Sequence, residues 1–250
     1  METVLETERQ AVMACGVEAD YAMAAGDNEH AEGQELLAEL CDQRAALYGL
    51  VSRLFLSEVD DDLLARMRLT PFPMRTGNES LDHGYALIVS YLSRTGDEAA
   101  HDLAIDYVRT FIGSENTAFS AAYPFESVYT SEKRLLMQEA RDEVAAIFKA
   151  EGFAVVVGWR DPEDHIGLEL SYMQMMSQRC AEALREGREE SARGLLEKQR
   201  NFMADHLASW VPMMLDDMRE KTQTDFYCGL SFLTEGLLAT DADLLDDVLG

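Results

Sequence analysis

Apolar residues recur at intervals of three and four along most of this chain, with polar and charged residues between them. Leu36, Leu40, Leu47, Leu50 and Leu54 show the pattern. Such spacing places one apolar stripe along a helix, so it predicts amphipathic helices that bury one face. The helices expected from the pattern cover residues 34–57, 61–69, 78–94, 97–112, 131–151, 162–186, 189–218 and 223–239. The sequence therefore predicts an all-α fold built as a single helical bundle.

Proline and glycine mark several of the expected boundaries. The stretch Thr70-Pro71-Phe72-Pro73 predicts a loop, and Gly113 is expected to close the helix before it as a C-terminal glycine. Only Val155-Val156-Val157 has strand character. Three such residues between Gly152 and Gly158 are more typical of an apolar loop anchor than of a strand.

Residues 1–33 differ from the rest of the chain. They are rich in Glu and Ala and carry only a weak apolar stripe, and Gly26-Asp27-Asn28 indicates a break after them. We expect an N-terminal helical extension over residues 1–33, followed by the main domain over residues 34–250. A packed or frayed terminal helix is favoured over a segment that covers a binding site.

Residues 161–170 concentrate ionisable groups at the start of an expected helix. Asp161 suits the N-cap, and Pro162 suits the first helical position, where a missing N–H costs nothing. His165 and Glu169 are four residues apart, so both should project from one face near this helix end. Read alone, such a histidine is typical of an ion-paired or capped surface residue.

Residues 123–129 form the second unusual segment, with Pro124 and two tyrosines in a stretch that breaks the helical period. We expect a rigid loop here that meets the helix start at residues 161–170, so that the two segments form the walls of a cleft. Glu126 either accepts backbone N–H groups of the following helix or faces a ligand. Tyr123 and Tyr129 are either core aromatics or stacking surfaces.

These motifs carry a resemblance to a known family. The Pro-x-Glu-Ser-Val-Tyr segment at residues 124–129, the Pro-x-Asp-His-x-x-x-Glu-Leu segment at 162–170 and the Phe-x-x-x-His-x-x-x-Trp-x-Pro segment at 202–212 resemble those of TorD/DmsD/NarJ redox-enzyme maturation chaperones. The similarity spans roughly residue 34 to the end of the chain. It implies a TorD-like all-helical cytoplasmic protein that binds the twin-arginine leader and the apo form of a molybdopterin oxidoreductase, masking export until its cofactor is inserted.

The resemblance also implies a set of residues that bind the leader peptide. Carboxylates would receive the two arginines, while tyrosines and apolar side chains would line a groove for the apolar stretch that follows. The expected signal-peptide-binding residues are Tyr123, Pro124, Glu126, Ser127, Tyr129, Asp164, His165 and Glu169. Many members of the family carry a Gly-Pro run shortly before the tyrosine loop, and residues 111–117 of this chain lack that proline.

The net charge of the chain limits the classes of partner that it can bind. The sequence has 47 acidic and 21 basic residues, a formal net charge of -26, with 47% hydrophobic residues. Such a charge repels nucleic acids and anionic membranes and attracts cationic partners. Solubility is the simplest reading of it, and an arginine-bearing peptide is compatible with it because carboxylates accept guanidinium groups bidentately.

Other features point to an ordinary intracellular protein. The four cysteines are far apart, without a Cys-x-x-Cys pair or zinc-ligand spacing, so we expect reduced and mostly buried thiols. The chain starts Met-Glu-Thr-Val-Leu-Glu without a basic region or long apolar run, which predicts no secretory signal. No segment approaches membrane-spanning length, and a cytoplasmic location is expected.

Two rival functions are weighed against the chaperone. A metal-dependent enzyme would use His165 and Glu169, or Glu98 and His101, but the Glu-x-x-His motif of a di-iron site occurs once and is needed twice. No phosphate loop or nucleophile motif appears, so we expect no catalytic residues, no metal and no cofactor. The other rival is an acidic helical adaptor for a folded basic partner. We expect a monomer or a helix-exchanged dimer.

Overall fold

A computed structural model describes residues 30–73, 75–113, 120–155 and 159–250. Within these residues every regular element is a helix, apart from an isolated antiparallel bridge between Phe125 and His165. The all-α prediction is therefore confirmed. Most of the expected N-terminal extension, and Val156-Val157 of the expected apolar anchor, lie outside the described residues.

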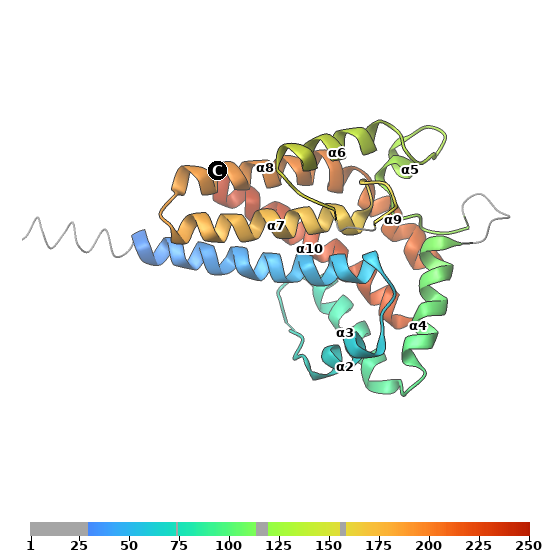
Figure 1. Cartoon of the computed structure of the whole chain (residues 1–250). Coiled ribbons are helices and arrows are strands. Elements are labelled where there is room, and N and C mark those ends of the chain that lie inside the picture. The colour runs from blue at the N-terminus through green and yellow to red at the C-terminus, as the bar shows by residue number, and fades with distance from the viewer. Residues whose placement is uncertain (1–29, 74, 114–119, 156–158) are drawn as a thin grey trace, which may run out of the picture.

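The helices follow one another along the described chain with short connections (Figure 1). The first runs over residues 30–56, so residues 30–33 of the expected extension are continuous with it. The remaining helices are α2 (Asp61–Leu69), α3 (Glu79–Arg94), α4 (Ala99–Tyr107), η1 (Val108–Ile112), α5 (Glu126–Thr130), α6 (Glu139–Ala150), α7 (Ile166–Arg185), α8 (Glu189–Phe202), η2 (Met203–Leu207), α9 (Ala208–Lys221) and α10 (Asp225–Leu249).

Helices α2 and α3 lie where the sequence predicts them, because each has a strong local start signal. The Asp60 carboxylate accepts from the backbone N–H of Leu63, and the Asn78 side chain accepts from those of Ser80 and Leu81. Gly113 closes η1 with a φ of 72°, as expected for a C-terminal glycine.

Two predicted helix starts are wrong. The helix expected from residue 131 begins only at Glu139, after a segment in which Arg134 and Met137 have φ values of 49° and 60°. The helix expected from Pro162 begins at Ile166, and its N-cap is His165 rather than Asp161. At the second start, backbone contacts of His165 and Ile166 with residues 124–125 outweigh the local signal.

The two long helices expected at 97–112 and 189–218 each contain a turn of π-helix. In the first, η1 forms the last turn, and in the second, η2 separates α8 from α9. Helix α9 after η2 contains Pro212, which has no N–H to donate to the preceding turn. A π turn widens the helix locally and changes the direction of its side chains.

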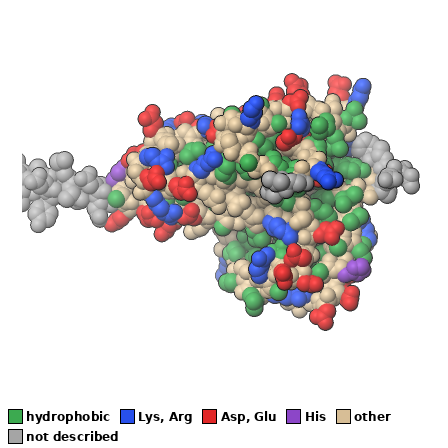
Figure 2. Space-filling view, in the orientation of Figure 1, with side chains coloured by type: hydrophobic (Ala, Val, Ile, Leu, Met, Phe, Trp, Pro, Cys, Tyr) green, Lys and Arg blue, Asp and Glu red, His purple; other side chains and the backbone are tan. Residues whose placement is uncertain are grey.

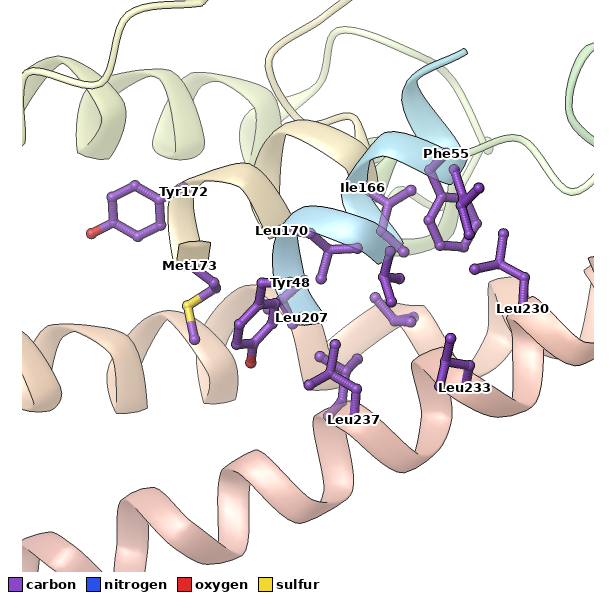
Figure 3. Close-up of a cluster of buried hydrophobic side chains, with 14 of the residues drawn as sticks. Tyr48, Phe55, Ile166, Leu170, Tyr172, Met173, Leu207, Leu230, Leu233 and Leu237 are labelled. Carbon is purple, nitrogen blue, oxygen red and sulfur yellow. The ribbon is translucent and has the colours of Figure 1, made fainter. Parts of the chain in front are cut away.

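The bundle is arranged around α7 and α10. The first helix runs beside α7, α6 and α8 cover the opposite side of α7, and α10 crosses behind and packs against α3, α8 and α9 (Figure 1). The Ser52 hydroxyl donates to the Gly167 carbonyl at 2.7 Å, which fixes the first helix against the start of α7. Side chains of the first helix, α7 and α10 meet in one buried core, with Tyr48, Leu170, Leu230 and others pointing toward one another (Figure 3).

Helices α3 and α10 approach so closely that glycine is required at their contact. A Cβ added to Gly84 would lie 2.6 Å from the Leu233 backbone nitrogen and 2.7 Å from the Gly229 carbonyl oxygen. Backbone atoms of a helix cannot shift as the end of a side chain can. The contact therefore depends on the absence of a side chain at this position.

A buried polar network joins four helices. The Arg44 guanidinium donates to both carboxylate oxygens of Asp241 and, at 2.8 Å, to the Gln199 side chain. Tyr48 donates to Asp241 at 2.6 Å, and Ser177 donates to Gln199 at 2.9 Å. All five residues are buried, so the charges of Arg44 and Asp241 depend on each other for compensation.

We expect Gly84→Ala to lower the free energy of unfolding by about 1–3 kcal/mol, because the methyl group overlaps backbone atoms of α10. Gly194→Ala in α8 is the matched control, since a Cβ there meets nothing within 4 Å. The control should raise stability by up to about 1 kcal/mol through helix propensity alone. Urea denaturation of both variants checks this; equal effects would contradict the close packing.

We expect Arg44→Met to lower the free energy of unfolding by about 3–5 kcal/mol, because it leaves the buried Asp241 carboxylate without its cation. The double variant Arg44→Met/Asp241→Leu should recover most of this loss. Glu197→Gln, which breaks the exposed pair with Arg193, is the control and should change stability by under about 1 kcal/mol. Chemical denaturation of the wild type and these three variants measures the differences, and a double variant no more stable than Arg44→Met would contradict mutual compensation.

Candidate functional site

The two unusual segments of the sequence lie against each other, as predicted. The Glu126 N–H donates to the Asp164 carbonyl at 3.0 Å, and the Ile166 N–H donates to the Pro124 carbonyl at 2.9 Å. These bonds flank the bridge between Phe125 and His165. The segments are therefore joined through their backbones, and they form one wall rather than the two walls of a cleft.

Asp164 and His165 fix this junction through their side chains. The buried Asp164 carboxylate accepts from the Ser127 N–H at 2.8 Å, at the start of α5. His165 Nδ1 accepts from the Gly167 N–H at 3.0 Å and so caps α7. Burial lowers the pKa of His165 to about 3, which keeps its ring neutral between the rings of Phe125 and Trp159. His165 therefore behaves as a capping core residue, not as a surface ion pair.

Glu126 pairs with a histidine from a distant part of the chain. His206 Nδ1 lies 3.2 Å from Oε1 and 3.1 Å from Oε2 of Glu126, and both residues are buried. Burial lowers the pKa of His206, but the hydrogen bond and charge of Glu126, helped by Glu143 and Asp205, raise it above the usual value overall. The imidazole reaches Glu126 from η2, the π turn between α8 and α9.

Glu169 lies beneath this pair as a fully buried carboxyl group. Its Oε2 accepts from the Trp210 indole N–H at 3.3 Å. Burial, with the nearby charges of Glu126 and Asp164, raises the pKa of Glu169 well above its usual value. Three buried oxygens of this cluster have no hydrogen-bond partner among the described residues, namely Glu169 Oε1, Asp164 Oδ1 and Ser127 Oγ. The cluster thus carries buried polar groups that are not all satisfied.

The two tyrosines have different surroundings. Tyr129 is half-buried, stacks on Trp210 at a centroid distance of 5.7 Å and donates to Asp217 at 3.0 Å. Burial and the Asp217 charge raise its pKa. Tyr123 is also half-buried, and its hydroxyl lies 3.2 Å from Ser120 Oγ. Tyr129 is thus part of the packed structure, whereas Tyr123 borders an open hollow described below.

An acidic hollow opens beside Glu126. It has a volume of about 540 Å³ and lies between α5, α6 and the η2–α9 turn. Its carboxylates come from Glu126, Glu139, Glu143 and Asp205. Among the described residues no Lys or Arg lines it, so the hollow suits a cation. In Figure 2, Asp and Glu side chains lie along the upper edge of the molecule, where α6 runs.

An apolar hollow of about 620 Å³ lies next to the acidic hollow, and Gln138 lines both. Tyr123, Val128, Leu135 and Leu136 give it its apolar surface, with Lys133 and Arg134 at its edge. Leu135, Leu136 and Met137 are 50%, 44% and 57% exposed, although they are large apolar side chains. Exposure of three successive apolar residues, in a segment with left-handed backbone at Arg134 and Met137, is typical of a binding surface.

Sequence reasoning missed the residues that line these hollows apart from Tyr123 and Glu126. Glu139 and Glu143 are four residues apart on α6, which places both on one face, but the expected helix over 131–151 read as an ordinary amphipathic helix. The run Leu135-Leu136-Met137 departs from that amphipathic pattern and is the signal that could have marked the apolar hollow.

A metal centre finds no support in the described part of the chain. No group of three or more His, Cys, Asp or Glu side chains there is placed to hold a metal ion. The described cysteines, Cys41, Cys180 and Cys228, are free thiols. Among the described residues, no helix is both long enough and apolar enough to cross a membrane.

Comparisons with known proteins agree with the motifs. The family model of the nitrate reductase delta subunit matches residues 78–216, which include both hollows and the Glu126–His206 pair. A chaperone protein TorD from Vibrio parahaemolyticus is 27% identical over 210 residues, covering 82% of this chain and 95% of the relative. A TorD from Vibrio cholerae is 25% identical over 217 residues, covering 84% of this chain and 94% of the relative.

One solved structure is also similar to the chain. It is described as that of a redox enzyme maturation protein from Archaeoglobus fulgidus. The TM-score is 0.44 at 20% sequence identity, and the match covers 76% of this chain and 90% of the other.

We expect Glu169→Gln to gain stability relative to the wild type as pH rises above about 4.5. A carboxyl group with a raised pKa in the folded protein disfavours folding increasingly as pH rises from its unfolded pKa to its folded pKa, and the amide does not ionise. Urea denaturation of both proteins at pH 5 and pH 8 measures the change. Parallel pH dependences would contradict the assignment of a protonated Glu169.

Proposed function

This chain belongs to the nitrate reductase delta subunit family, and from that premise we propose that it is a cytoplasmic maturation chaperone for a molybdopterin oxidoreductase. The curated relatives are named TorD chaperones, not enzymes. The alignment with this chain covers nearly their whole length. In our proposal the chain binds the twin-arginine leader and the apo form of its client. It masks the export signal until the cofactor has been inserted.

The adjacency of the acidic and apolar hollows carries this proposal. A twin-arginine leader presents two cations followed by an apolar stretch, and the chain presents carboxylates followed by exposed leucines. Gln138, which lines both hollows, marks where one surface passes into the other. The whole arrangement lies within the residues matched by the family model.

The arginines are proposed to enter the acidic hollow. Glu139 and Glu143 are exposed and meet the guanidinium groups first, and Glu126 receives one of them at the base. Carboxylates bind guanidinium groups through paired, charge-assisted hydrogen bonds. The net charge of -26 attracts a cationic peptide before contact is made.

The buried residues of the predicted set are proposed to act by position. Asp164 and Glu169 are fully buried, so their part is to hold and tune Glu126 rather than to meet an arginine in open solvent. Ser127 and His165 fix the starts of α5 and α7. A substitution at Asp164, Glu169, Ser127 or His165 would therefore change the position or charge of Glu126 and so the shape of the acidic hollow.

The apolar stretch of the leader is proposed to lie on the apolar hollow. Pro124 fixes the loop at the junction, and Tyr123 provides one aromatic wall. Tyr129 supports the floor of the site by stacking on Trp210. Leu135 and Leu136 provide the exposed apolar area, which an apolar peptide would remove from water.

No bond is made or broken in this mechanism. Binding covers the arginines that the export machinery would read, and it keeps the apoenzyme close to the chaperone. Release follows when folding of the client, or the export machinery, competes for the leader. The chain itself requires no metal and no cofactor for this role.

The acidic hollow by itself would also suit a basic surface of a folded partner, which is the adaptor alternative. Leu135, Leu136 and Met137 are exposed, and they favour the leader peptide over an adaptor role. A basic folded surface would not fill the adjoining apolar hollow, whereas the apolar stretch of a leader would. An adaptor would bind its partner but not an isolated leader.

We expect Glu139→Gln/Glu143→Gln to weaken binding of a twin-arginine leader by about tenfold or more, the loss expected for a charge-assisted hydrogen bond. The probe is a synthetic leader of a molybdoenzyme encoded beside this chain, measured by titration calorimetry. Asp243→Asn/Asp247→Asn near the end of α10 is the control, with the same change in net charge. Replacing both arginines of the leader by lysines should also weaken binding.

Equal weakening by the two double variants would show that only net charge matters, which would contradict an arginine site in the hollow. No binding of any leader to the folded wild-type protein would exclude the leader role and favour the adaptor.

A further inference from the structure

Building on the proposed function, we propose that His206 is an internal substitute for the leader arginine. In the free protein its imidazolium occupies Glu126, and an incoming guanidinium displaces it. Binding of the leader is therefore coupled to release of a proton. His206 then sets both the specificity of the site for arginine and its response to pH.

Glu126 contacts a histidine that belongs to a second hollow. Glu126 itself lines the acidic hollow, where the arginine is proposed to enter. Its partner His206 lines a smaller hollow of about 220 Å³ with Tyr172 and Phe202. Asp205 lines both hollows. The ligand and the histidine therefore meet at one carboxylate but approach it from different hollows.

The smaller hollow provides room for the displaced ring. His206 itself lines this hollow, so its ring has open space beside it into which it can turn. The His206 ring already lies 4.9 Å from the Phe202 ring, between centroids, on the side of this hollow. His206 lies in the π turn η2, and π turns within helices are frequent at functional sites.

The carboxylate of Glu126 can pair better with an arginine guanidinium than with the His206 imidazolium. His206 reaches both oxygens of Glu126 through one nitrogen, Nδ1, at 3.1 and 3.2 Å. A guanidinium group offers two parallel N–H donors to the same two oxygens. An ammonium group lacks this planar fork, so lysine competes less well with the histidine than arginine does.

The groups that face His206 favour its protonated form only while Glu126 is available. Glu126 from α5, Glu143 from α6 and Asp205 beside it contribute negative charge. Tyr172 from α7 lines the same hollow, and burial raises its pKa, so it stays uncharged. Lys198 from α8 also lines the hollow but is paired with Glu151 at 2.7 Å. Once an arginine neutralises Glu126, His206 loses its main partner and its proton.

The sign of the pH dependence follows from this exchange. His206 has a raised pKa in the free protein, so below that pKa the leader must displace a bound imidazolium and release its proton. Affinity for the leader therefore rises with pH by up to about tenfold per unit until the pKa of His206 is passed, and then levels off. Arginine stays charged throughout this range and adds no dependence of its own.

Titration calorimetry of the full chain at pH 6.5 to 8.5 tests the exchange. The probe is an N-acetylated peptide without histidine that carries two adjacent arginines followed by a leucine- and alanine-rich stretch. Two buffers with different ionisation enthalpies report the protons released on binding. We expect release of up to one proton in the wild type, and affinity that rises with pH.

His206→Gln should abolish the proton release and the pH dependence, and it should bind the peptide more tightly than the wild type at pH 6.5. His83→Gln in α3 is the control, because His83 is exposed, packs on the Phe232 ring and lines neither hollow as described. Binding without proton release, or with proton uptake, by the wild type would overturn the exchange while leaving the leader site in place. No binding at all would instead exclude the proposed function.

Discussion

The junction between residues 124–127 and 164–166 is the constraint on which the site depends. Two backbone hydrogen bonds and one carboxylate bond join a loop to the start of a helix more than thirty residues later, in a fold that is otherwise helical. The first N–H groups of α5 and α7 have no acceptor within their own helices. Here the first N–H groups of α5 donate to Asp164, and that of α7 donates to the Pro124 carbonyl. The junction fixes Glu126 at the edge of the acidic hollow.

The same junction places several ionisable side chains in the interior of the bundle. Asp164, Glu169, Glu126 and His206 are all buried within a short distance of one another, and only part of their hydrogen-bonding capacity is used. Buried polar groups of this kind cost stability unless they are paired, so they are poor choices for a structural core alone. The Arg44–Asp241 network elsewhere in the bundle shows the opposite case, a buried charge pair with nearly complete satisfaction. The contrast is typical of a site that is preorganised for a ligand.

The surface around the junction is divided by polarity. Carboxylates of α5, α6 and η2 border one hollow, and the side chains of residues 133–136 border the next. A peptide with cations at one end and an apolar stretch at the other matches both at once, and neither hollow alone would distinguish it from other ligands. Family membership and the chaperone relatives support the class of partner that we propose, and the hollows suggest the chemistry by which this chain would recognise it.

The sequence by itself determined the helical class, the starts of α2 and α3 and the two segments that form the junction, because periodicity, caps and clustered polar residues act locally. It also determined the family, through motifs whose order and spacing are linear features of the chain. The tertiary structure alone decided that His165 caps α7, that residues 131–138 leave the helix, and that His206 meets Glu126 across eighty positions of sequence. The positions of His165 and His206 depend on burial and on contacts between distant segments, and neither is encoded in the local pattern of polar and apolar residues.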